Sequence, residues 1–212
     1  MISIAIPTGT LLDGSLDLLR RAGVVDLDRE EIGRKLLVDQ NGRRVVLVKP
    51  ADVPAYVDHG SADLGIVGKD ALWETERVHY ELLDLGFGGC RLVMAVPEDS
   101  VLGNRASWPP MIRVATKYPG ATRRYFEALG QETELIKLYG SVELAPLIGL
   151  ADAVVDLTAT GGTLRENRLR EVVEVDRSTA RLIANQVSMR TRSAEVQEVI
   201  AKFRQSLSDA AA

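Results

Sequence analysis

Short apolar segments that end near a glycine and precede a helical pattern recur along this chain. Residues 2–6, 63–68 and 153–157 form such segments. Successive apolar positions are typical of strands buried on both faces, and the helical patterns that separate these segments suit crossover connections. Strands of this kind build parallel sheets that bind ligands at the carboxyl ends of the strands. The sequence therefore predicts an α/β fold.

The rest of the chain also alternates between strand and helix patterns. Asn41-Gly42 between two apolar runs is a strong β-hairpin signal. Asp52 can cap a helix that ends near Gly60, and a terminal amphipathic helix carries Val196, Val199, Ile200, Phe203 and Leu207 at helical spacing. We expect further helices over 13–21, 70–74, 121–129, 141–150 and from 163 toward 169, and further strands over 35–38, 45–48, 91–96, 112–115 and 134–138.

The glycine-dense segment 86–89 predicts a crossing from one lobe to another. Strand-like runs at 172–175 and 181–184 can return the chain to the first lobe. We therefore expect two small α/β lobes with mostly parallel sheets. Lobe I comprises residues 1–89 plus 178–212, and lobe II comprises residues 90–177.

Composition excludes several function classes. The 212 residues include 26 Lys and Arg against 30 Asp and Glu, so the formal charge is -4 and a nucleic-acid partner is not expected. One cysteine and two histidines do not make an internal disulfide or an ordinary zinc site. The start of the chain lacks a signal-peptide pattern, and no apolar run reaches membrane-spanning length. We expect no membrane association and a cytoplasmic location.

The segment 154–164 carries the clearest chemical signal, because a buried strand ends in Asp156 and is followed by hydroxyls, glycines and a helix. Glycines let backbone amides approach an anion, and threonines add hydroxyl donors. A phosphate suits amides at a helix start, whereas Asp156 suits sugar hydroxyls or a Mg²⁺ ion. The alternative is a tight turn in which the threonines only cap the helix. The candidate phosphosugar-binding residues are Asp156, Thr158, Ala159, Thr160, Gly161, Gly162 and Thr163.

These motifs resemble those of a known family, ATP phosphoribosyltransferase in its short form, the first enzyme of histidine biosynthesis. The resemblance covers most of the chain. The segment from Gly140-Ser141-Val142-Glu143 through 149–153 to Thr163-Leu164 is similar to the signature of that family. The other matching segments are Lys49 to Val57, Asp63 to Asp70 and Ala115 to Pro119.

The resemblance implies transfer of a phosphoribosyl group from phosphoribosyl pyrophosphate to N1 of ATP, with release of pyrophosphate and with Mg²⁺ as cofactor. It also implies two lobes arranged like a bilobal binding protein, with the active site in the cleft. Residues 156–163 would hold the 5′-phosphate and ribose of the donor. The metal is expected to be held through substrate phosphates, and no residue is assigned as a general acid or base.

Because pyrophosphate departs with negative charge, cations matter more for this reaction than a nucleophilic side chain. The residues expected to bind ATP or pyrophosphate are Arg34, Lys49, Lys117, Glu143 and Asp70. Lys49 stands where the family leads us to expect arginine, and Thr8 and Thr10 stand where it leads us to expect basic residues. Arg91 can reach an anion or form a surface ion pair.

The resemblance further implies a separate regulatory partner similar to histidyl-tRNA synthetase, assembled with the transferase as a hetero-octamer, together with self-association. Two other interpretations remain open from the residues alone. One is a bilobal module that only binds a small anion. The other is a purine or orotate phosphoribosyltransferase, although such enzymes usually carry two adjacent acids before the loop, whereas this chain has Val155-Asp156.

Overall fold

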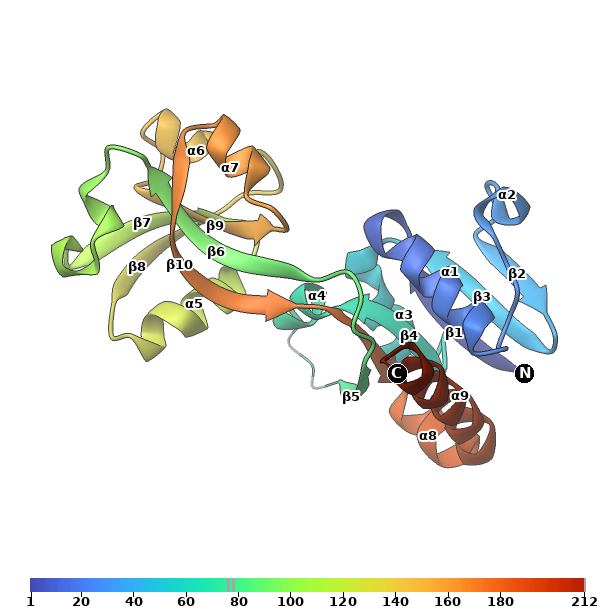
Figure 1. The fold of residues 1–212 in the computed structure, drawn as a ribbon. Coiled ribbons are helices and arrows are strands. Elements are labelled where there is room, and N and C mark those ends of the chain that lie inside the picture. Colours follow the sequence, from blue (N-terminus) through green and yellow to red (C-terminus); the bar gives the residue numbers. More distant parts are fainter. Residues whose placement is uncertain (76, 78, 212) are drawn as a thin grey trace. The chain divides into compact units, whose positions relative to one another are not determined.

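A computed structural model describes residues 1–75, 77 and 79–211. The chain forms two compact units (Figure 1). Unit 1 comprises Met1–Gly88 and Thr179–Ala212, and unit 2 comprises Gly89–Ser178. The chain therefore leaves unit 1 once and returns to it once.

Unit 1 is built on a six-stranded sheet with the order β2-β3-β1-β4-β11-β5. β1 pairs in parallel with β3 and β4, while the other neighbours are antiparallel. The strands are β1 (Ile2–Pro7), β2 (Leu37–Gln40), β3 (Arg43–Val48), β4 (Leu64–Gly68), β5 (Tyr80–Asp84) and β11 (Ala180–Ala184). The helices are α1 (Leu12–Arg21), α2 (Arg29–Ile32), α3 (Val53–Asp58), α4 (Lys69–Trp73), α8 (Gln186–Thr191) and α9 (Ser193–Ala211), with short 3-10 turns at Gly9–Leu11 and Pro50–Asp52.

Alternate residues of β1 build the cores on the two faces of this sheet. Ile2, Ile4 and Ile6 are fully buried in a cluster that includes apolar side chains of α1 and α9. Ala5 belongs to the other cluster, which α3 completes through its valines. Side chains alternate across a strand, so a strand covered by helices on both faces must be apolar throughout. This explains the continuous apolar run at the start of the sequence.

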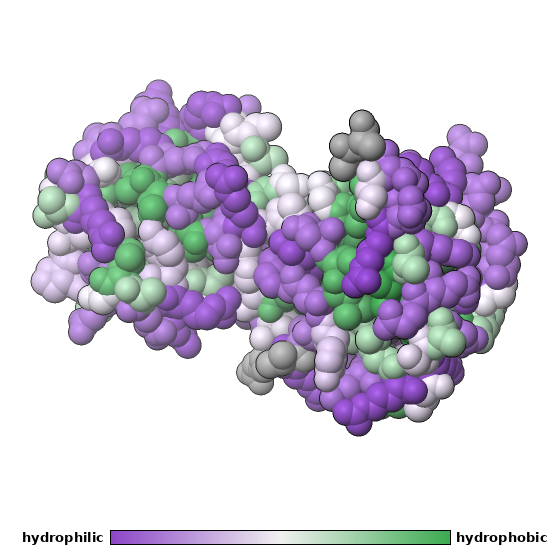
Figure 2. Space-filling model, turned by 60° about the horizontal axis from the view of Figure 1, so that its bottom comes forward, coloured by the Kyte–Doolittle hydropathy of each residue, from purple (hydrophilic) through white to green (hydrophobic). Residues whose placement is uncertain are grey.

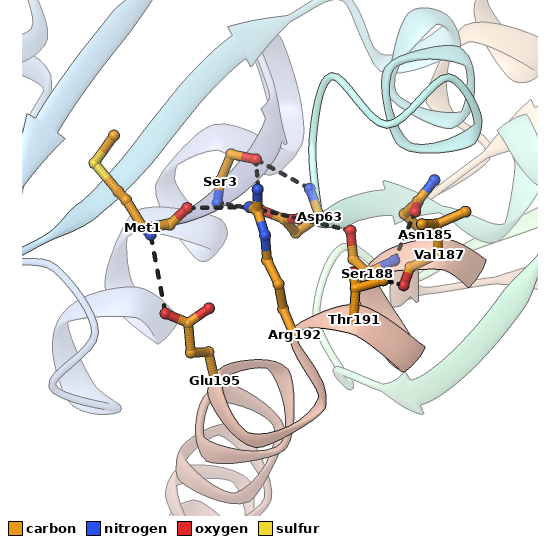
Figure 3. A network of polar contacts seen from close by, with 9 residues as sticks. All are labelled: Met1, Ser3, Asp63, Asn185, Val187, Ser188, Thr191, Arg192 and Glu195. Atoms are coloured by element: carbon orange, nitrogen blue, oxygen red, sulfur yellow. Dashed lines mark hydrogen bonds and ion pairs between the residues drawn. The ribbon is translucent and has the colours of Figure 1, made fainter.

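A buried carboxylate joins the first strand of unit 1 to α8 and to Arg192, which lies between α8 and α9 (Figure 3). Asp63, only 3% exposed, precedes β4 and accepts hydrogen bonds from the Ser3 backbone N–H and hydroxyl, both at 2.8 Å. Ser188 of α8 donates its hydroxyl at 2.6 Å, and Arg192 contributes Nη1 at 3.0 Å and 3.1 Å. Burial alone would raise the pKa of Asp63, but these hydrogen bonds and the Arg192 charge outweigh it and lower that pKa.

Unit 2 is built on a five-stranded sheet with the order β10-β6-β9-β7-β8. β7 pairs in parallel with β8 and β9, while β6 is antiparallel to β9 and β10. α5 packs against β8, α6 against β9, and α7 against β10. The elements are β6 (Cys90–Pro97), β7 (Met111–Thr116), α5 (Pro119–Ala128), β8 (Glu132–Lys137), α6 (Leu144–Leu147), β9 (Ala153–Thr158), α7 (Gly162–Glu166) and β10 (Leu169–Ser178), with 3-10 turns at Val101–Gly103 and Arg105–Ser107.

The α/β class and the two-lobed organisation are confirmed, but the sheets are mixed and not mostly parallel. The Asn41-Gly42 hairpin makes β2 antiparallel to β3, and both residues have the positive φ values that this turn needs, 52° and 69°. β6 runs antiparallel to β9, and β11 runs antiparallel to β4. β10 is the edge strand of its sheet and pairs antiparallel with β6. Antiparallel neighbours therefore accompany each passage of the chain into or out of a unit.

Two expected elements also differ from the structure. The helix predicted over 141–150 is only α6, because Ser141 has a positive φ of 47° and Gly149 a positive φ of 77°. The run 172–175 does not return to the first lobe: it lies within β10, at the edge of the sheet of unit 2. The return is made by β11, which pairs with β4 and β5.

The surface is mainly hydrophilic on the face drawn in Figure 2, where hydrophobic side chains gather in smaller patches. Within the described ranges, no helix is both long enough and apolar enough to span a bilayer.

We predict that Asp63→Ala lowers the free energy of unfolding by about 3–5 kcal/mol, because it removes the acceptor shared by Ser3, Ser188 and Arg192 and leaves their donors unpaired. Urea unfolding followed by circular dichroism would measure this. The folded-state pKa of Asp63 is lowered, so its contribution is present at neutral pH and is lost as pH falls through that pKa. The gap between wild type and variant should therefore narrow in acid.

Asp39→Ala is the matched control, because Asp39 makes hydrogen bonds of 2.8 Å and 2.9 Å to Arg44 on the exposed hairpin. Exposed pairs contribute little to stability. Equal losses in the two variants would contradict the structural role of Asp63.

Candidate active site

The candidate site lies at the carboxyl end of β9, the middle strand of the sheet in unit 2. β9 buries its first three residues and then emerges at Asp156, which is partly exposed. The loop continues through Thr158 to Gly161, and α7 begins at Gly162. Gly161 has a φ of +72°, a left-handed conformation that glycine adopts without strain. The glycine is therefore needed for the chain to turn from strand into helix.

Hydroxyls of the loop already bind two of its own amides. The Gly161 N–H donates to Thr158 Oγ1 at 2.7 Å, and the Gly162 N–H donates to Thr160 Oγ1 at 3.4 Å. A hydroxyl that accepts from an amide can turn its own proton outward to another acceptor. α7 has no side-chain cap at its start. It is only five residues long, so individual amides matter more here than the summed helix dipole invoked from the sequence.

A pocket of about 520 Å³ opens beside this loop. It brings together most of the residues expected from the sequence to bind the phosphosugar. Glu143, which precedes α6, lines the same pocket, and so does Glu166 at the end of α7. The predicted residues in its wall are Glu143, Asp156, Thr158, Ala159, Thr160, Gly162 and Thr163.

The pocket imposes an electrostatic cost on Asp156. Burial raises the pKa of Asp156, and the charge of Glu143 raises it further, whereas the Leu157 N–H and Lys117 oppose the rise. The Leu157 N–H donates to Asp156 Oδ1 at 2.8 Å. A carboxylate held at such a cost in a pocket is a candidate functional group.

Lys117 lies in the turn after β7, the parallel neighbour of β9. Carboxyl ends of parallel strands meet at one edge of a sheet, which explains why its charge acts on Asp156. Two buried threonines support this turn. Thr116 donates to the Val155 carbonyl at 2.7 Å and accepts from the Tyr118 N–H at 2.9 Å, while Thr122 donates to the Tyr118 carbonyl at 2.7 Å. The sequence offered no signal for this supporting role.

The other predicted residues lie in unit 1. Arg34 lines a separate pocket of about 210 Å³ together with Thr8, Arg29 and Lys35. Lys49 is exposed and precedes the 3-10 turn at Pro50–Asp52. Asp70 is the second residue of α4, and its carboxylate fills the space beside Gly68 that a Cβ would need. The residues expected to bind ATP or pyrophosphate are therefore divided, with Arg34, Lys49 and Asp70 in unit 1 and Lys117 and Glu143 in unit 2.

Arg91, for which an anion contact and a surface pair were both open, forms ion pairs. Its guanidinium donates to both carboxylate oxygens of Glu171, at 2.8 Å and 3.1 Å. Sequence reasoning missed Glu171, because its position opposite Arg91 depends on irregularities in β10.

Two carboxylates of the loop pocket could serve as metal ligands, Asp156 and Glu143. Among the residues that the structure describes, no group of three or more His, Cys, Asp or Glu side chains could hold a metal ion. Asp156 and Glu143 do line one pocket and offer the oxygen ligands that Mg²⁺ prefers. The pocket therefore fits a Mg²⁺ ion that also has ligands from a bound phosphate, rather than an all-protein metal site.

Comparison with known proteins connects this chain to one family. The family model of ATP phosphoribosyltransferase (HisG) matches residues 49–205. An ATP phosphoribosyltransferase of Caldanaerobacter subterraneus subsp. tengcongensis is 45% identical over 210 residues, which are 97% of each chain.

Solved structures agree with this match. The ATP phosphoribosyl transferase (HisG:HisZ) complex from Thermotoga maritima contains a chain that is 34% identical, with a TM-score of 0.82 and coverage of 99% of this chain and 100% of that one. The periplasmic aliphatic sulphonate binding protein SsuA from Escherichia coli is 16% identical, with a TM-score of 0.63 over 97% of this chain and 68% of that one. The second likeness concerns the fold alone and supports the expected resemblance to bilobal binding proteins.

We predict that Asp156→Asn raises the midpoint of thermal unfolding at neutral pH. Because the folded-state pKa of Asp156 is raised, its charge destabilises the fold above that pKa, and this cost disappears as pH falls through it. The stabilisation by Asn should therefore shrink in acid. Scanning calorimetry across a pH series would measure it, and a lower midpoint at neutral pH would contradict the electrostatic assignment.

Proposed function

The chain belongs to the ATP phosphoribosyltransferase family, and from this premise we propose how its residues carry out the reaction. The reaction is a pentosyl transfer from phosphoribosyl pyrophosphate to N1 of ATP, with release of pyrophosphate, in histidine biosynthesis. The family match removes both alternatives that the residues alone left open, the anion-binding module and the purine or orotate phosphoribosyltransferase. The loop pocket of unit 2 is the observation that carries the assignment of roles.

We assign the donor to residues 156–163. Threonine hydroxyls and backbone amides of this loop would bind the 5′-phosphate, because Thr158, Thr160 and Thr163 line the pocket and each hydroxyl can donate a proton to an anion. Asp156 would accept hydrogen bonds from the ribose hydroxyls. Its carboxylate next to the sugar would also stabilise the positive charge that develops as the glycosidic bond breaks. That role explains why a carboxylate is kept where burial opposes its ionisation.

Lys117 is proposed to contact the phosphates of the leaving pyrophosphate, since its charge already reaches Asp156. Glu143 is proposed to share the pocket as a ligand for Mg²⁺ together with substrate phosphates. Bound Mg²⁺ would supply charge neutralisation for the departing pyrophosphate. Adenine N1 is itself nucleophilic, so the transfer needs no protein nucleophile.

We assign the phosphates of ATP to Arg34 and Lys49, with Asp70 as a further polar contact. Arg34 shares its pocket with Lys35 and with Arg29, which is paired with Asp13. Cations therefore gather there beside apolar side chains such as Leu12. Cations suit the triphosphate and an apolar wall suits the base. Thr8 in the same wall supplies a hydroxyl in place of the expected basic residue.

A HisZ partner is also proposed, as in the Thermotoga maritima complex to which this chain is similar. This partner corresponds to the regulatory subunit, similar to histidyl-tRNA synthetase, that the sequence led us to expect. The hetero-octameric stoichiometry and self-association are part of the same proposal. The substrates, ATP and phosphoribosyl pyrophosphate, are cytoplasmic metabolites, and we propose that location for the chain.

The reaction is tested by mass spectrometry of products formed from ATP, phosphoribosyl pyrophosphate and Mg²⁺, with pyrophosphatase added to draw the equilibrium forward. We expect an ATP adduct that carries one phosphoribosyl group. If no adduct forms with or without a HisZ partner, the proposed function is wrong.

We predict that Asp156→Ala and Thr163→Val each abolish measurable binding of phosphoribosyl pyrophosphate while the fold is retained. The first change removes the ribose acceptor, and the second replaces a hydroxyl donor in the pocket by a methyl group of equal size. Titration calorimetry measures the binding, with circular dichroism as the check on folding. Wild-type affinity in both variants would refute the donor assignment.

A further inference from the structure

A carboxylate lies directly against the backbone of the donor loop. Glu171 Oε1 is 2.9 Å from the position that a Cβ on Gly161 would take. The Arg165 guanidinium lies at the same distance from that position. The backbone at Gly161 therefore lies beside a cation of α7 and beside a carboxylate that belongs to β10, a strand outside the motif.

Two β-bulges bring charged side chains of β10 onto one face of the sheet. In a regular strand, residues three apart point to opposite faces, but a bulge between them restores the same face. β10 has register shifts between Glu171 and Val173 and between Glu174 and Asp176. Glu171 pairs with Ala95, and Arg177 pairs with Arg91 of β6. Glu171 and Glu174 thus share the face on which Arg91 lies.

Arg91 is the counter-charge to Glu171. It holds both oxygens of Glu171 at 2.8 Å and 3.1 Å and approaches Glu174 at 3.6 Å. The side chains of Arg91 and Glu171 are each 33% exposed, so solvent screens the pair only in part. Arg177 forms a second ion pair, with Glu174. Arg91 also pairs in register with Thr158, the first residue of the loop.

We propose that Arg91 is a positioning residue for the donor site, which holds and neutralises Glu171 so that the loop 156–163 accepts a phosphate dianion. The inference rests on the proposed function, because it takes the loop as the site of the donor phosphate. Bidentate pairing with an arginine holds a carboxylate in one orientation and offsets its negative charge. Among the ion pairs of the described residues, Glu171 is paired with Arg91 and not with Arg165. Without Arg91, the charge of Glu171 would therefore oppose anion binding.

Substitution of Arg91 and substitution of Glu171 should have different effects on donor affinity, although the two residues form one ion pair. Arg91→Ala should weaken binding of phosphoribosyl pyrophosphate by about tenfold or more, because it leaves Glu171 charged beside the loop. Glu171→Gln removes the pair and the repulsive charge together, so it should bind the donor at least as tightly as wild type. The double variant Arg91→Ala, Glu171→Gln should recover most of the lost affinity. A purely structural pair would instead give similar losses in both single variants and no recovery in the double variant.

Titration calorimetry with phosphoribosyl pyrophosphate measures these affinities, and steady-state kinetics should show a raised KM for the donor with little change in kcat. Arg113→Ala is the matched control, because Arg113 binds Asp152 at 2.7 Å on the same sheet. Asp152 precedes β9, at the end of that strand opposite to the loop, so this variant should keep wild-type donor affinity. Arg91→Lys, which keeps the charge, replaces Arg91→Ala if the latter does not fold and should lose less affinity.

The outcomes separate the two proposals. If the wild-type chain does not bind phosphoribosyl pyrophosphate, the proposed function fails. If the wild type binds and Arg91→Ala binds equally well, or if Glu171→Gln loses as much affinity as Arg91→Ala, the inference about Arg91 is wrong while the function stands.

Discussion

The carboxylate of Asp63 connects the first strand of the chain to the segment that follows β11, through hydrogen bonds from Ser3, Ser188 and Arg192. β1 and β4 belong to the first part of unit 1, whereas α8 and α9 are reached only after the chain has built unit 2 and returned through β11. Hydrogen bonds from Ser3, Ser188 and Arg192 meet at this one side chain. A buried charge is stable only when it is fully paired, so the network forms as a unit. Closure of unit 1 therefore depends on the return of the chain.

Unit 2 carries the opposite arrangement at Asp156. Asp63 is buried with donors that lower its pKa, whereas Asp156 is partly buried and its pKa is raised by that burial and by the charge of Glu143. The first carboxylate stabilises the fold and the second destabilises it. Residues that act on a ligand commonly impose such a cost, because their missing partners are supplied by that ligand. The contrast distinguishes Asp63, which stabilises the fold, from Asp156, which we propose binds the donor.

Local chemistry could be predicted from the sequence wherever a few adjacent residues decide the conformation. The Asn41-Gly42 hairpin is an example, since its turn needs positive φ at both positions. The helix expected over 141–150 is longer than α6, because the apolar pattern of this segment gives no sign of the left-handed backbone at Ser141 and Gly149. The pairing of β10 with β6 depends on long-range register. The position of Glu171 beside the loop also depends on the bulges in β10. Such features have no short sequence signal.

Backbone amides carry no net charge, so the charged side chains around an anion site determine whether its surroundings attract or repel the anion. Here the loop pocket has acids in its wall, Asp156, Glu143 and Glu166, and a fourth, Glu171, behind Gly161. Unbalanced, these acids would repel a phosphate. In our proposal Arg91 neutralises Glu171, and the positive charge of Lys117 acts on Asp156. The acids that line the pocket are left for a substrate that brings positive charge with it, which is what a Mg²⁺-bound pyrophosphate ester would do.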